Sequence, residues 1–490
     1  MKIEKVRFIE PGNVPYKKSF KNLFVYDKYI RTPSNGLLIL TTIMKEHVRD
    51  SFMYSESISK IQWDDVLDAD VIFIGFFTFA ANRGYELAQY IRNNSNAIII
   101  LGGLHPTLNY EEACNYCDYV ILGEGDEAIV DMIKVLEKEL SIDDVPGIAY
   151  KRDENIITTQ KRTPPQNIDV IPNHSLLYNF QRMAGHSTIW PQVHASRGCP
   201  HNCNYCALIS AFGRNVRTRT PENIVEDIRR TIEFFDSKHH RLAKMLWLTD
   251  DNFFADRNWA ISVLKFIIKS GINYHFTIQA RYEVGYDDEM LELLKSAGFI
   301  EIAMGIEFLE DEAFEKYNKK STYNDILKAI KNIQSHGIRV RGLFIVGADN
   351  HTKGIGEKLA NFVIEHNICG VLIQSMYFIP GTPVYETHKN KLLHTDWSKC
   401  IGNVVHSPEN ISPYDLQKEI IYASRKIYSF KRLISSVIKK RGVERILFIG
   451  EYIWQISVRS KLKKELPNLE RNYMDKNLHN ALSTSSFIEH

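Results

Sequence analysis

The feature that most constrains the fold of this chain is a repeated alternation of apolar runs and amphipathic helical patterns between residues 192 and 378. Unbroken apolar runs are typical of parallel strands, because helices cover such strands on both faces. Six strand–helix units in about 190 residues predict an α/β fold with an open, partial (β/α)6 barrel rather than a closed barrel of eight strands. We assign this barrel to residues 192–385.

The barrel strands are predicted at Gln192–Ala195, Met245–Leu248, Tyr274–Ile278, Glu301–Ile306, Val340–Val346 and Val371–Phe378. The helices between them are predicted at Glu222–Phe235, Trp259–Lys269, Glu289–Ala297, Tyr323–Ser335 and Glu357–His366. Functional side chains of such barrels lie at the carboxyl ends of the strands. We therefore expect the chemistry of the chain at those ends.

A second strand–helix alternation precedes the barrel and predicts a Rossmann-like, doubly wound domain over residues 1–140. Its strands are predicted at Val6–Ile9, Val71–Phe77, Ala97–Leu101 and Tyr119–Leu122, and its helices at Arg83–Arg92 and Glu127–Leu140. Cys114 and Cys117 lie in this domain, but two thiols cannot hold an iron–sulfur cluster by themselves. Residues 141–191 carry scattered Pro, Asn, Thr and charge, and we interpret them as a linker with room for one hairpin.

After residue 385 the alternation stops, and residues 386–490 are predicted to form a helical extension. The extension is locally basic at Lys431-Arg432 and Lys439-Lys440-Arg441; a solvated face is the favoured interpretation and membrane contact the alternative. The formal net charge of +2 gives no reason to expect a nucleic-acid partner. No run approaches the roughly 20 apolar residues of a membrane span, and the N-terminus lacks the apolar core of a signal peptide. We therefore expect a cytoplasmic protein.

The cysteines are distributed unevenly. Seven in 490 residues are too few for a disulfide scaffold, yet Cys199, Cys203 and Cys206 fall together directly after the first predicted barrel strand. Three thiolates on one loop can hold three irons of a [4Fe–4S] cubane and leave the fourth iron open to another ligand. A zinc site with His201 as fourth ligand is the alternative, although the position of His201 between two of the cysteines makes a closed tetrahedron awkward.

The Cys-x3-Cys-x2-Cys spacing, with Tyr205 directly before the third cysteine, resembles the radical S-adenosylmethionine (SAM) superfamily. The partial (β/α)6 barrel of that superfamily agrees with the strand count. The resemblance implies that SAM binds the open iron and is cleaved reductively to a 5′-deoxyadenosyl radical, with an electron from a flavodoxin or ferredoxin. It also implies a small-molecule substrate.

Several strand ends resemble the SAM-facing segments of the superfamily. Together with Tyr205, the residues implied to face SAM are Asp250, Asp251, Arg281, Glu307 and Gly347. Phe308 stands where the superfamily usually has Ser, and Pro380-Gly381-Thr382-Pro383 resembles its turn after the sixth strand. Other interpretations stay open, because the two aspartates could cap helices and Arg281 could pair with them. For Glu307 the functional role is favoured, since a buried carboxylate is costly unless it is paired.

Two glycine-containing turns follow neighbouring strands of the first domain: Gly102-Gly103-Leu104-His105-Pro106-Thr107 and Gly123-Glu124-Gly125-Asp126. Glycines there let a backbone approach a ligand at the carboxyl edge of the sheet. As a pair, the turns resemble the cobalamin (B12)-binding domain that is fused to many radical SAM enzymes. The residues that this resemblance implies beside the corrin are Thr78, Asn82, Arg83, Gly102, Gly103, His105, Gly123 and Glu124.

Within that set we interpret His105 as packing its own loop rather than binding cobalt. The string Asp349-x-His351-x-x-Gly354 matches the one by which other cobalamin proteins supply a histidine to cobalt. It follows the fifth barrel strand instead of lying in the first domain, so we interpret it as a coincidence.

Taken together, the two resemblances imply a [4Fe–4S] cluster, SAM and cobalamin as cofactors, and methyl transfer to an unactivated carbon of a small metabolite, natural product or lipid. The first alternative is a cobalamin-independent radical SAM enzyme with a vestigial B12-type domain, catalysing dehydration, epimerisation, cyclisation or carbon–carbon bond formation. A non-catalytic cobalamin or iron–sulfur sensor is the second alternative. The substrate itself is not encoded in any motif of the sequence.

Overall fold

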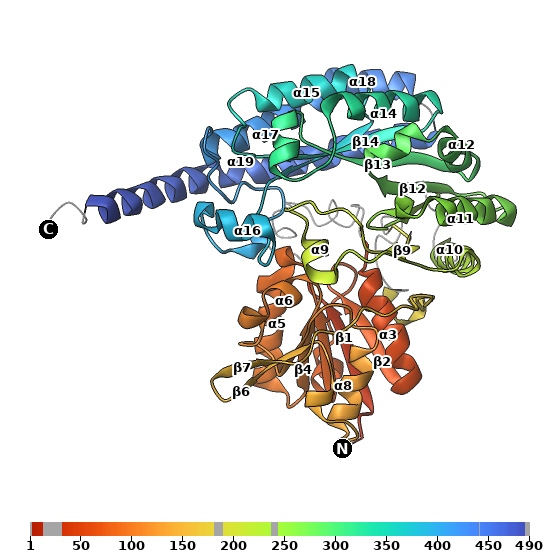
Figure 1. The fold of residues 1–490 in the computed structure, drawn as a ribbon, viewed down its shortest axis with the longest axis vertical. Coiled ribbons are helices and arrows are strands. Elements are labelled where there is room, and N and C mark those ends of the chain that lie inside the picture. The colour runs from red at the N-terminus through yellow and green to blue at the C-terminus, as the bar shows by residue number, and fades with distance from the viewer. Residues whose placement is uncertain (1, 13–31, 181–189, 237–243, 441, 486–490) are drawn as a thin grey trace.

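The computed structural model of the protein describes residues 2–12, 32–180, 190–236, 244–440 and 442–485. Figure 1 shows two α/β regions stacked along the long axis, with the N-terminal sheet at one end, the second sheet at the other, and the C-terminal helix projecting sideways. The doubly wound first domain, the partial barrel and the helical C-terminal region predicted from the sequence are confirmed in this arrangement.

The first sheet has seven strands in the order β2-β1-β3-β4-β5-β6-β7. Their bounds are β1 Lys5–Glu10, β2 Asp50–Ser55, β3 Val71–Gly75, β4 Ile98–Gly102, β5 Tyr119–Ile121, β6 Ile148–Arg152 and β7 Asn155–Thr158. Strands β1 to β5 pair in parallel, whereas β6 and β7 pair antiparallel at the end of the sheet. Sequence patterns missed β2, because its residues Asp50-Ser51-Phe52-Met53-Tyr54-Ser55 form an edge strand without the unbroken apolar run of a central one.

Helices cover both faces of this sheet, as a parallel sheet requires. They are α3 Asn35–His47, α4 Trp63–Leu67, α5 Ala81–Asn94, α6 Leu104–Leu108, α7 Tyr110–Ala113 and α8 Ala128–Leu136. The rings of Phe8 and Phe73 stack 4.8 Å apart in the core that α3 and α8 cover. Ile72, Ile74 and Leu101 point to the opposite core, beneath α4 and α5. The alternating side chains of each strand thus supply two separate hydrophobic layers.

The β6–β7 hairpin lies within the segment 141–191 that we interpreted as a linker. It adds to the edge of the first sheet through pairs such as Val120 with Ala149. Ile148 and Ala149 are fully buried there. This part of the segment therefore belongs structurally to the first domain.

The second sheet has six strands in the order β15-β14-β13-β12-β11-β8, all paired in parallel. The strands are β8 Gln192–Val193, β11 Met245–Leu248, β12 His275–Ala280, β13 Phe299–Glu307, β14 Arg339–Val346 and β15 Gly370–Ser375. The intervening helices are α10 Pro221–Asp236, α11 Arg257–Ser270, α12 Asp288–Ser296, α13 Asp311–Lys316, α14 Tyr323–Ser335 and α15 Ile355–Glu365. The strand order confirms an open, six-stranded partial barrel.

A short excursion separates the first two barrel strands. Strands β9 Ser196–Arg197 and β10 Arg217–Thr218 pair antiparallel, and helix α9 Ala207–Phe212 lies between them. The three clustered cysteines fall in this excursion, between β9 and α9. In Figure 1, α9 and β9 stand between the two sheets.

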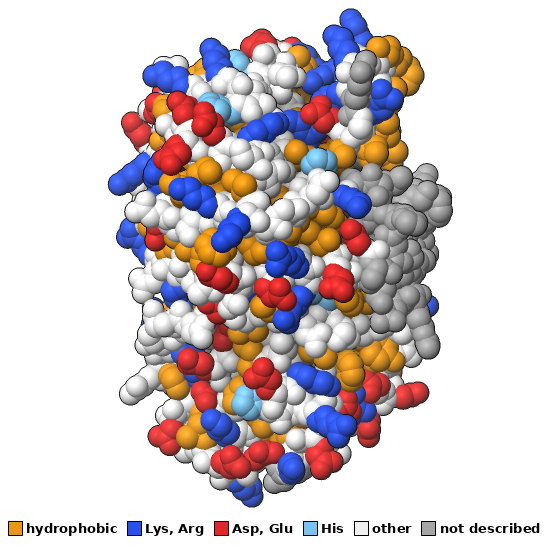
Figure 2. Space-filling model, turned by 90° about the vertical axis from the view of Figure 1, so that its right-hand side faces the viewer, with side chains coloured by type: hydrophobic (Ala, Val, Ile, Leu, Met, Phe, Trp, Pro, Cys, Tyr) orange, Lys and Arg blue, Asp and Glu red, His pale blue; other side chains and the backbone are white. Residues whose placement is uncertain are grey.

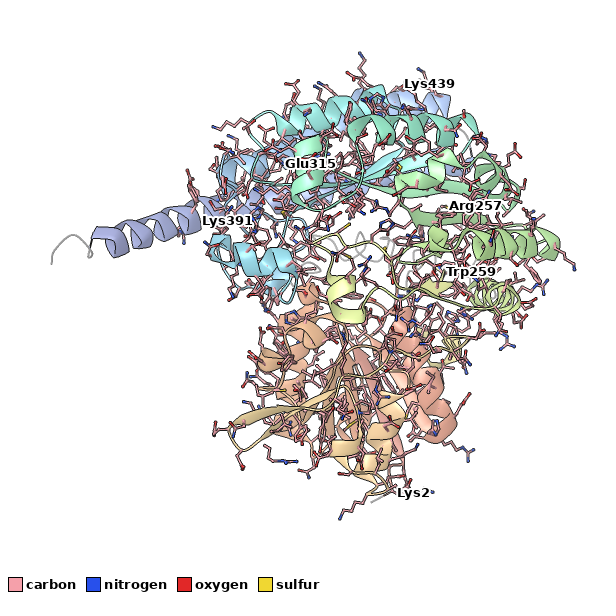
Figure 3. All side chains as sticks on the ribbon, viewed as in Figure 1. Lys2, Arg257, Trp259, Glu315, Lys391 and Lys439 are labelled. Atoms are coloured by element: carbon pink, nitrogen blue, oxygen red, sulfur yellow. The ribbon has the colours of Figure 1, made fainter. Side chains whose placement is uncertain are left out.

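The C-terminal region comprises α16 Pro383–His388, α17 Pro413–Ile427, α18 Phe430–Lys439 and α19 Gly442–Ser485. Much of it completes the barrel core, because Leu416, Ile420 and Tyr428 are buried in the same cluster as the barrel strands. Trp397 and Cys400 instead pack into the core of the first domain. Figure 3 shows side chains extending from the strands and helices of both regions. None of the described helices has the length and apolar character needed to cross a bilayer.

Candidate active site

A cavity of about 430 Å³ lies where the carboxyl edge of the first sheet meets the excursion that holds the cysteines. The first domain contributes the glycine turns after β4 and β5, including Gly102, Gly103 and Gly123. The barrel domain contributes Arg197 and Gly198 of the excursion. The cavity therefore reaches the segment that leads into the cysteine loop, although none of the three cysteines lines it. Such junctions between domains, at the carboxyl ends of parallel strands, are common ligand sites.

The walls of this cavity are mostly apolar, with Phe76, Phe77 and Phe79 after β3 and Ile129 of α8 among them. Gly123 leaves open space, since a Cβ atom there would meet only the Ala211 carbonyl oxygen, 3.9 Å away. A backbone without side chains beside aromatic walls fits the close approach of a large flat ring such as a corrin. The cavity is thus compatible with cobalamin.

Two polar groups stand out in these walls. The Thr249 hydroxyl is buried and has no hydrogen-bond partner among the described residues. Glu10, at the end of β1, accepts a hydrogen bond from the Ser55 hydroxyl at 2.5 Å. Burial raises the pKa of Glu10 to about 7, against which hydrogen bonds from Ser55 and the Ser34 backbone act only partly. The cavity therefore contains a carboxyl group that titrates near neutral pH.

Four of the residues implied beside the corrin do not line the cavity, namely Thr78, Asn82, Arg83 and His105. Asn82 Nδ2 instead donates to Asp396 Oδ1 at 2.8 Å. Thr78 is buried and its hydroxyl lies 3.3 Å from His105 Nδ1. His105 packs edge-on against Trp397, with ring centroids 5.4 Å apart, and its Nε2 lies 4.0 Å from Glu112. Arg83 is held by Glu56, 2.8 Å from its Nη2. These residues lie on the α5 side of the first sheet, where Trp397 of the C-terminal region docks, while Gly102, Gly103, Gly123 and Glu124 face the cavity.

Glu124 lines the cavity, but its carboxylate is engaged by the barrel domain. Arg197 Nη1 donates to Glu124 at 2.7 Å and to Asp126 at 2.9 Å. Arg217, on the paired strand β10, also forms an ion pair with Glu124. The four side chains are largely buried, and removal of one partner from such a buried ion pair leaves an uncompensated charge. This network joins the glycine turn of the first domain to the strand that leads into the cysteine loop.

The cysteine loop starts from a glycine that no other residue can replace without rearrangement. Gly198 has φ +95°, and a Cβ atom there would lie 2.2 Å from the Asn215 carbonyl oxygen. The loop then carries Cys199, Cys203 and Cys206 as partly buried free thiols. Burial raises the pKa of the Cys199 thiol and raises that of Cys206 to about 11. Without a metal the two groups are therefore protonated, and metal ligation would release these protons.

A zinc ion and a cubane make different demands on the three thiols of the loop. Among the described residues, no three His, Cys, Asp or Glu side chains converge on a single-ion position. A cubane takes each thiolate on a different iron, so it requires no such convergence. Nη1 of the Arg281 guanidinium lies 4.0 Å from the Cys203 sulfur, so a positive charge stands beside the loop. The loop thus fits an iron–sulfur cluster.

Asp250 and Asp251, at the end of β11, both hold the segment that leads into this loop. Asp250 accepts hydrogen bonds from the Ala195 amide at 2.6 Å and the Ser196 hydroxyl at 2.9 Å. Asp251 accepts one from the Gly198 amide at 2.8 Å and lines the cavity. Neither aspartate caps a helix in the structure. Burial raises the pKa of Asp250 to about 7.

Arg281 and Glu307 lie at the ends of neighbouring strands. Arg281 pairs with Glu283 at 2.9 Å instead of with the aspartates. Glu307 has a positive φ of 66°, a strained backbone geometry for a residue with a side chain, and the β13–β14 register shifts beside it. Its Oε1 lies 3.3 Å from Nζ of Lys319. Burial, then the negative charge of Glu307, raises the pKa of the Tyr205 hydroxyl well above its usual range.

Gly347 follows β14 and is surrounded by histidines. Its amide donates to His351 Nδ1 at 3.0 Å, and its carbonyl oxygen lies 2.8 Å from His406 Nε2. Asp349, two residues later, pairs with Lys316 at 2.9 Å and Lys391 at 2.8 Å. Asp349 and His351 of the Asp-x-His-x-x-Gly string therefore make their contacts within the barrel region, and neither lines the cavity.

Motif reasoning missed Lys319, Glu10, Arg197 and Arg217. Only Lys319 carries a signal that could have been noticed, because it begins the polar run Lys319-Lys320-Ser321-Thr322 that follows the short helix α13 after Glu307. Glu10 is the polar last residue of β1, and no motif marks it in the sequence. Arg197 and Arg217 carry no signal in the sequence, because their partners Glu124 and Asp126 lie in the other domain.

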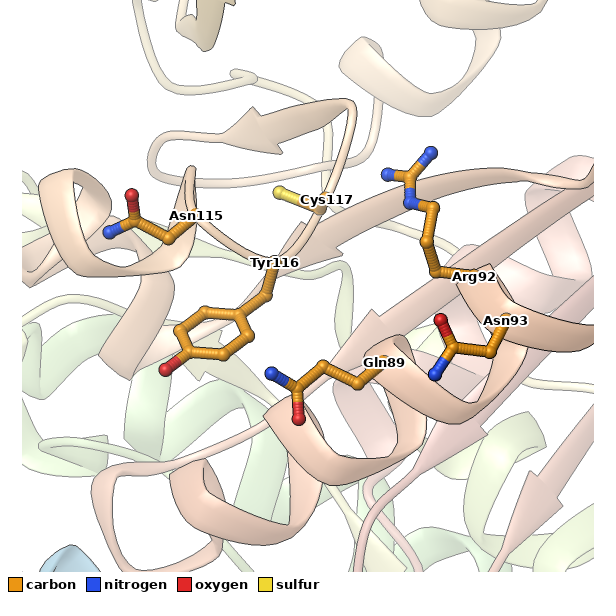
Figure 4. A pocket seen from close by; sticks show the side chains of 6 residues that line it. All are labelled: Gln89, Arg92, Asn93, Asn115, Tyr116 and Cys117. Carbon is orange, nitrogen blue, oxygen red and sulfur yellow. The ribbon is translucent and has the colours of Figure 1, made fainter.

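A second, polar pocket of about 370 Å³ lies on the first domain and contains none of the predicted site residues (Figure 4). Side chains of α5 and of the loop before β5 line it, namely Gln89, Arg92, Asn93, Asn115, Tyr116 and Cys117. Arg92 is paired with Asp118 at 2.8 Å, and Cys117 Sγ donates to the Ala113 carbonyl at 3.3 Å. This pocket lacks the features of a catalytic site.

Comparisons with known proteins agree with this geometry. Residues 193–363 match the Radical SAM superfamily, and residues 31–133 match the B12 binding domain. The chain is 24% identical to the hopanoid C-2 methylase of Rhodopseudomonas palustris, covering 88% of this chain and 81% of that protein. It is also 24% identical to the bacteriochlorophyllide d C-12(1)-methyltransferase of Chlorobaculum tepidum, with 84% and 86% covered.

Among solved structures, the fold is similar to that of the radical SAM methyltransferase TsrM from Kitasatospora setae, which was determined with cobalamin and a [4Fe–4S] cluster bound. The TM-score is 0.68 at 12% identity, and the similarity covers 95% of this chain and 100% of that one. At this identity the likeness establishes a shared fold.

Proposed function

Because the chain carries a B12 binding domain followed by a radical SAM domain, we propose that it is a cobalamin-dependent radical SAM enzyme that methylates a carbon atom of a small molecule. The cavity between the two domains is the observation that carries this proposal. It brings the glycine turns of the B12 binding domain against Arg197 and Gly198, which lead directly into the cysteine loop. A methyl donor held on one side would then lie beside the site of radical formation on the other.

The residues of the chain have separable roles in this proposal. Cys199, Cys203 and Cys206 hold the [4Fe–4S] cluster, and the glycine turns cradle cobalamin. When bound, the cluster supplies the electron for reductive SAM cleavage and cobalamin carries the methyl group. Glu307 offers a carboxylate and Arg281 a guanidinium at the strand ends that surround the cluster loop. Hydrogen bonds to a charged group are stronger than those between neutral groups, so both side chains suit the zwitterionic part of SAM.

The reactions for which the two relatives are named support methylation at carbon. One acts on hopanoid at C-2 and the other on bacteriochlorophyllide d at C-12(1). We extend to this chain only the reaction class and a small-molecule substrate. A flavodoxin or ferredoxin is proposed as the electron donor, and the reducing cytoplasm as the location, since it preserves free thiols.

The proposal is tested on full-length protein purified anaerobically from cells supplied with cobalamin. Iron, sulfide and cobalamin are quantified, and the protein is then incubated with a reductant and SAM that carries a deuterated methyl group. Mass spectrometry follows 5′-deoxyadenosine and S-adenosylhomocysteine. Formation of both products, with S-adenosylhomocysteine dependent on bound cobalamin, is the expected result.

Two other results would overturn parts of the proposal. The protein could form 5′-deoxyadenosine alone and take up no cobalamin even after deliberate loading. This result would contradict methyl transfer and indicate a radical reaction of another type. Absence of both products from protein with a full complement of iron would remove radical SAM chemistry altogether.

A further inference from the structure

Helix α18 presents apolar side chains that the rest of the described chain does not cover. Five of its ten residues are apolar, three are basic and two are serine, and none of the ten is buried. Phe430 is 67% exposed and Ile438 is 72% exposed, with Ile434 and Val437 exposed between them. Contiguous apolar exposure of this kind marks an interaction surface, because water disfavours it.

The four exposed apolar residues share one side of the helix. At about 100° of rotation per residue, Phe430, Ile434, Val437 and Ile438 fall within an arc of roughly 100°. Leu433, which lies outside this arc, packs against the barrel core. The apolar face therefore points away from the body of the protein. Apolar exposure continues on the next helix, α19, at Ile446, Ile453 and Ile456.

The surroundings of this face are strongly basic. Between residues 420 and 443 the sequence contains seven Lys and Arg residues and no Asp or Glu. Lys431 and Lys439 are exposed on α18 itself, and Arg441 lies outside the described residues. At the top of Figure 2, Lys and Arg side chains stand beside hydrophobic ones. An apolar stripe bordered by basic residues is the pattern of helices that lie in the interface of an anionic bilayer.

The position of α18 in the molecule suits such a contact. Figure 1 places it at the end of the long axis opposite the first sheet, and Figure 3 shows Lys439 at that outer edge. The cavity between the domains lies toward the middle of the molecule, at α9. A surface that covered α18 would therefore leave the cavity free.

We propose that α18 is an interfacial helix that docks the protein on an anionic lipid bilayer. Phe430, Ile434 and Ile438 enter the boundary between headgroups and acyl chains, while Lys431 and Lys439 contact lipid phosphates. Pairing of this face with the same face of a second copy is disfavoured, because it would bring together two segments in which Lys and Arg outnumber Asp and Glu. The proposal rests on exposure and charge alone and is independent of the proposed reaction.

The test is flotation of the full-length protein with vesicles of equimolar phosphatidylglycerol and phosphatidylcholine, compared with phosphatidylcholine alone. Phe430→Ser/Ile438→Ser removes the two most exposed apolar side chains of α18 without touching a buried position. Ile268→Ser/Ile364→Ser is the matched control, since these isoleucines are 39% and 38% exposed on α11 and α15. Each protein is measured at about 0.1 M and about 1 M salt, because screening weakens contacts with lipid phosphates.

We expect the wild-type protein and the control to bind anionic vesicles at low salt. The α18 variant should bind these vesicles at least about tenfold more weakly. Equal binding by the α18 variant and the wild type, or no preference for anionic vesicles, would overturn the proposal. So would a loss of self-association in the α18 variant, seen by light scattering, without any change in vesicle binding, because the face would then join two copies of the chain.

Discussion

Lys319 Nζ lies 3.3 Å from Glu307 Oε1, and the same ammonium group donates to the Gly305 carbonyl at 2.5 Å. Lys319 is buried. Burial lowers its pKa, although the charge of Glu307 acts in the opposite direction. Glu307 has a strained backbone at the end of its strand, and the buried ammonium group of Lys319 fixes the orientation of its carboxylate. We therefore treat Lys319 as a positioning residue for Glu307.

Replacement of this pair should affect SAM binding before it affects the cluster. Glu307→Gln should keep iron and sulfide content and weaken SAM binding by about tenfold or more, because a charge-assisted hydrogen bond is lost. Lys319→Met should weaken SAM binding in the same direction, and Lys319→Arg should restore part of it. Calorimetry on the cluster-loaded proteins measures the affinity. Unchanged affinity in Glu307→Gln would remove Glu307 from the SAM site.

Cys203→Ala should abolish both the broad brown iron–sulfur absorption and SAM cleavage, since only two thiols of the loop would remain. Cys117→Ala is the matched control, because Cys117 is also a partly buried free thiol but lies in the first domain. Iron and sulfide analysis with absorption spectra distinguishes the two variants. Wild-type iron content in Cys203→Ala would contradict the assignment of the cluster.

The Glu10 carboxyl should make cobalamin affinity depend on pH. Its folded-state pKa of about 7 is raised from 4.5 by burial, so its contribution to stability is present below about pH 4.5 and is lost as pH rises through about 7. A ligand that fills the cavity excludes further water and favours the neutral carboxyl. Cobalamin affinity should therefore fall as pH rises through about 7, and Glu10→Gln should flatten this dependence. Absorption titrations with aquacobalamin at several pH values measure the affinity. An equal dependence of affinity on pH in the wild type and in Glu10→Gln would show that Glu10 is not the titrating group.

Glu301 should contribute to the acid sensitivity of the barrel. It is buried between β13 and β14, with Arg339 Nη2 at 2.5 Å and Arg341 Nε at 2.7 Å. Although burial acts to raise the pKa of Glu301, the two arginines lower it from 4.5 to about 2. The ion pairs of Glu301 with the two arginines therefore stabilise the fold above about pH 4.5, and this stability is lost as pH falls through about 2.

Glu301→Gln should reduce the free energy of unfolding by about 3 kcal/mol at neutral pH, because Arg339 loses its carboxylate partner and Arg341 keeps only Glu451. Glu289→Gln is the control: Glu289 lies 2.6 Å from Arg257, but its side chain is 57% exposed, so its loss should cost less than about 1 kcal/mol. Chemical denaturation measures both. Similar values for the two variants would contradict the importance of burial.

The fold was predictable because its signals are local. The apolar runs at Val71, Ala97 and Tyr119 mark buried parallel strands from a few neighbouring residues. The spacing of Cys199, Cys203 and Cys206 likewise lies within one loop. The edge strand β2 escaped prediction, because it is covered on fewer sides and carries no unbroken apolar run.

The sequence by itself therefore determined the order of the domains, the strand–helix units and the loop on which the three cysteines lie together. Only the tertiary structure decided that Lys319 meets Glu307, that Glu124 binds arginines of the other domain, and that His105 packs against Trp397 instead of facing the cavity. The physical reason is that strand periodicity and ligand spacing are set by neighbours along the chain. The pairing of a charge or a ring depends on which loops the strand order and the domain contact bring to the same edge.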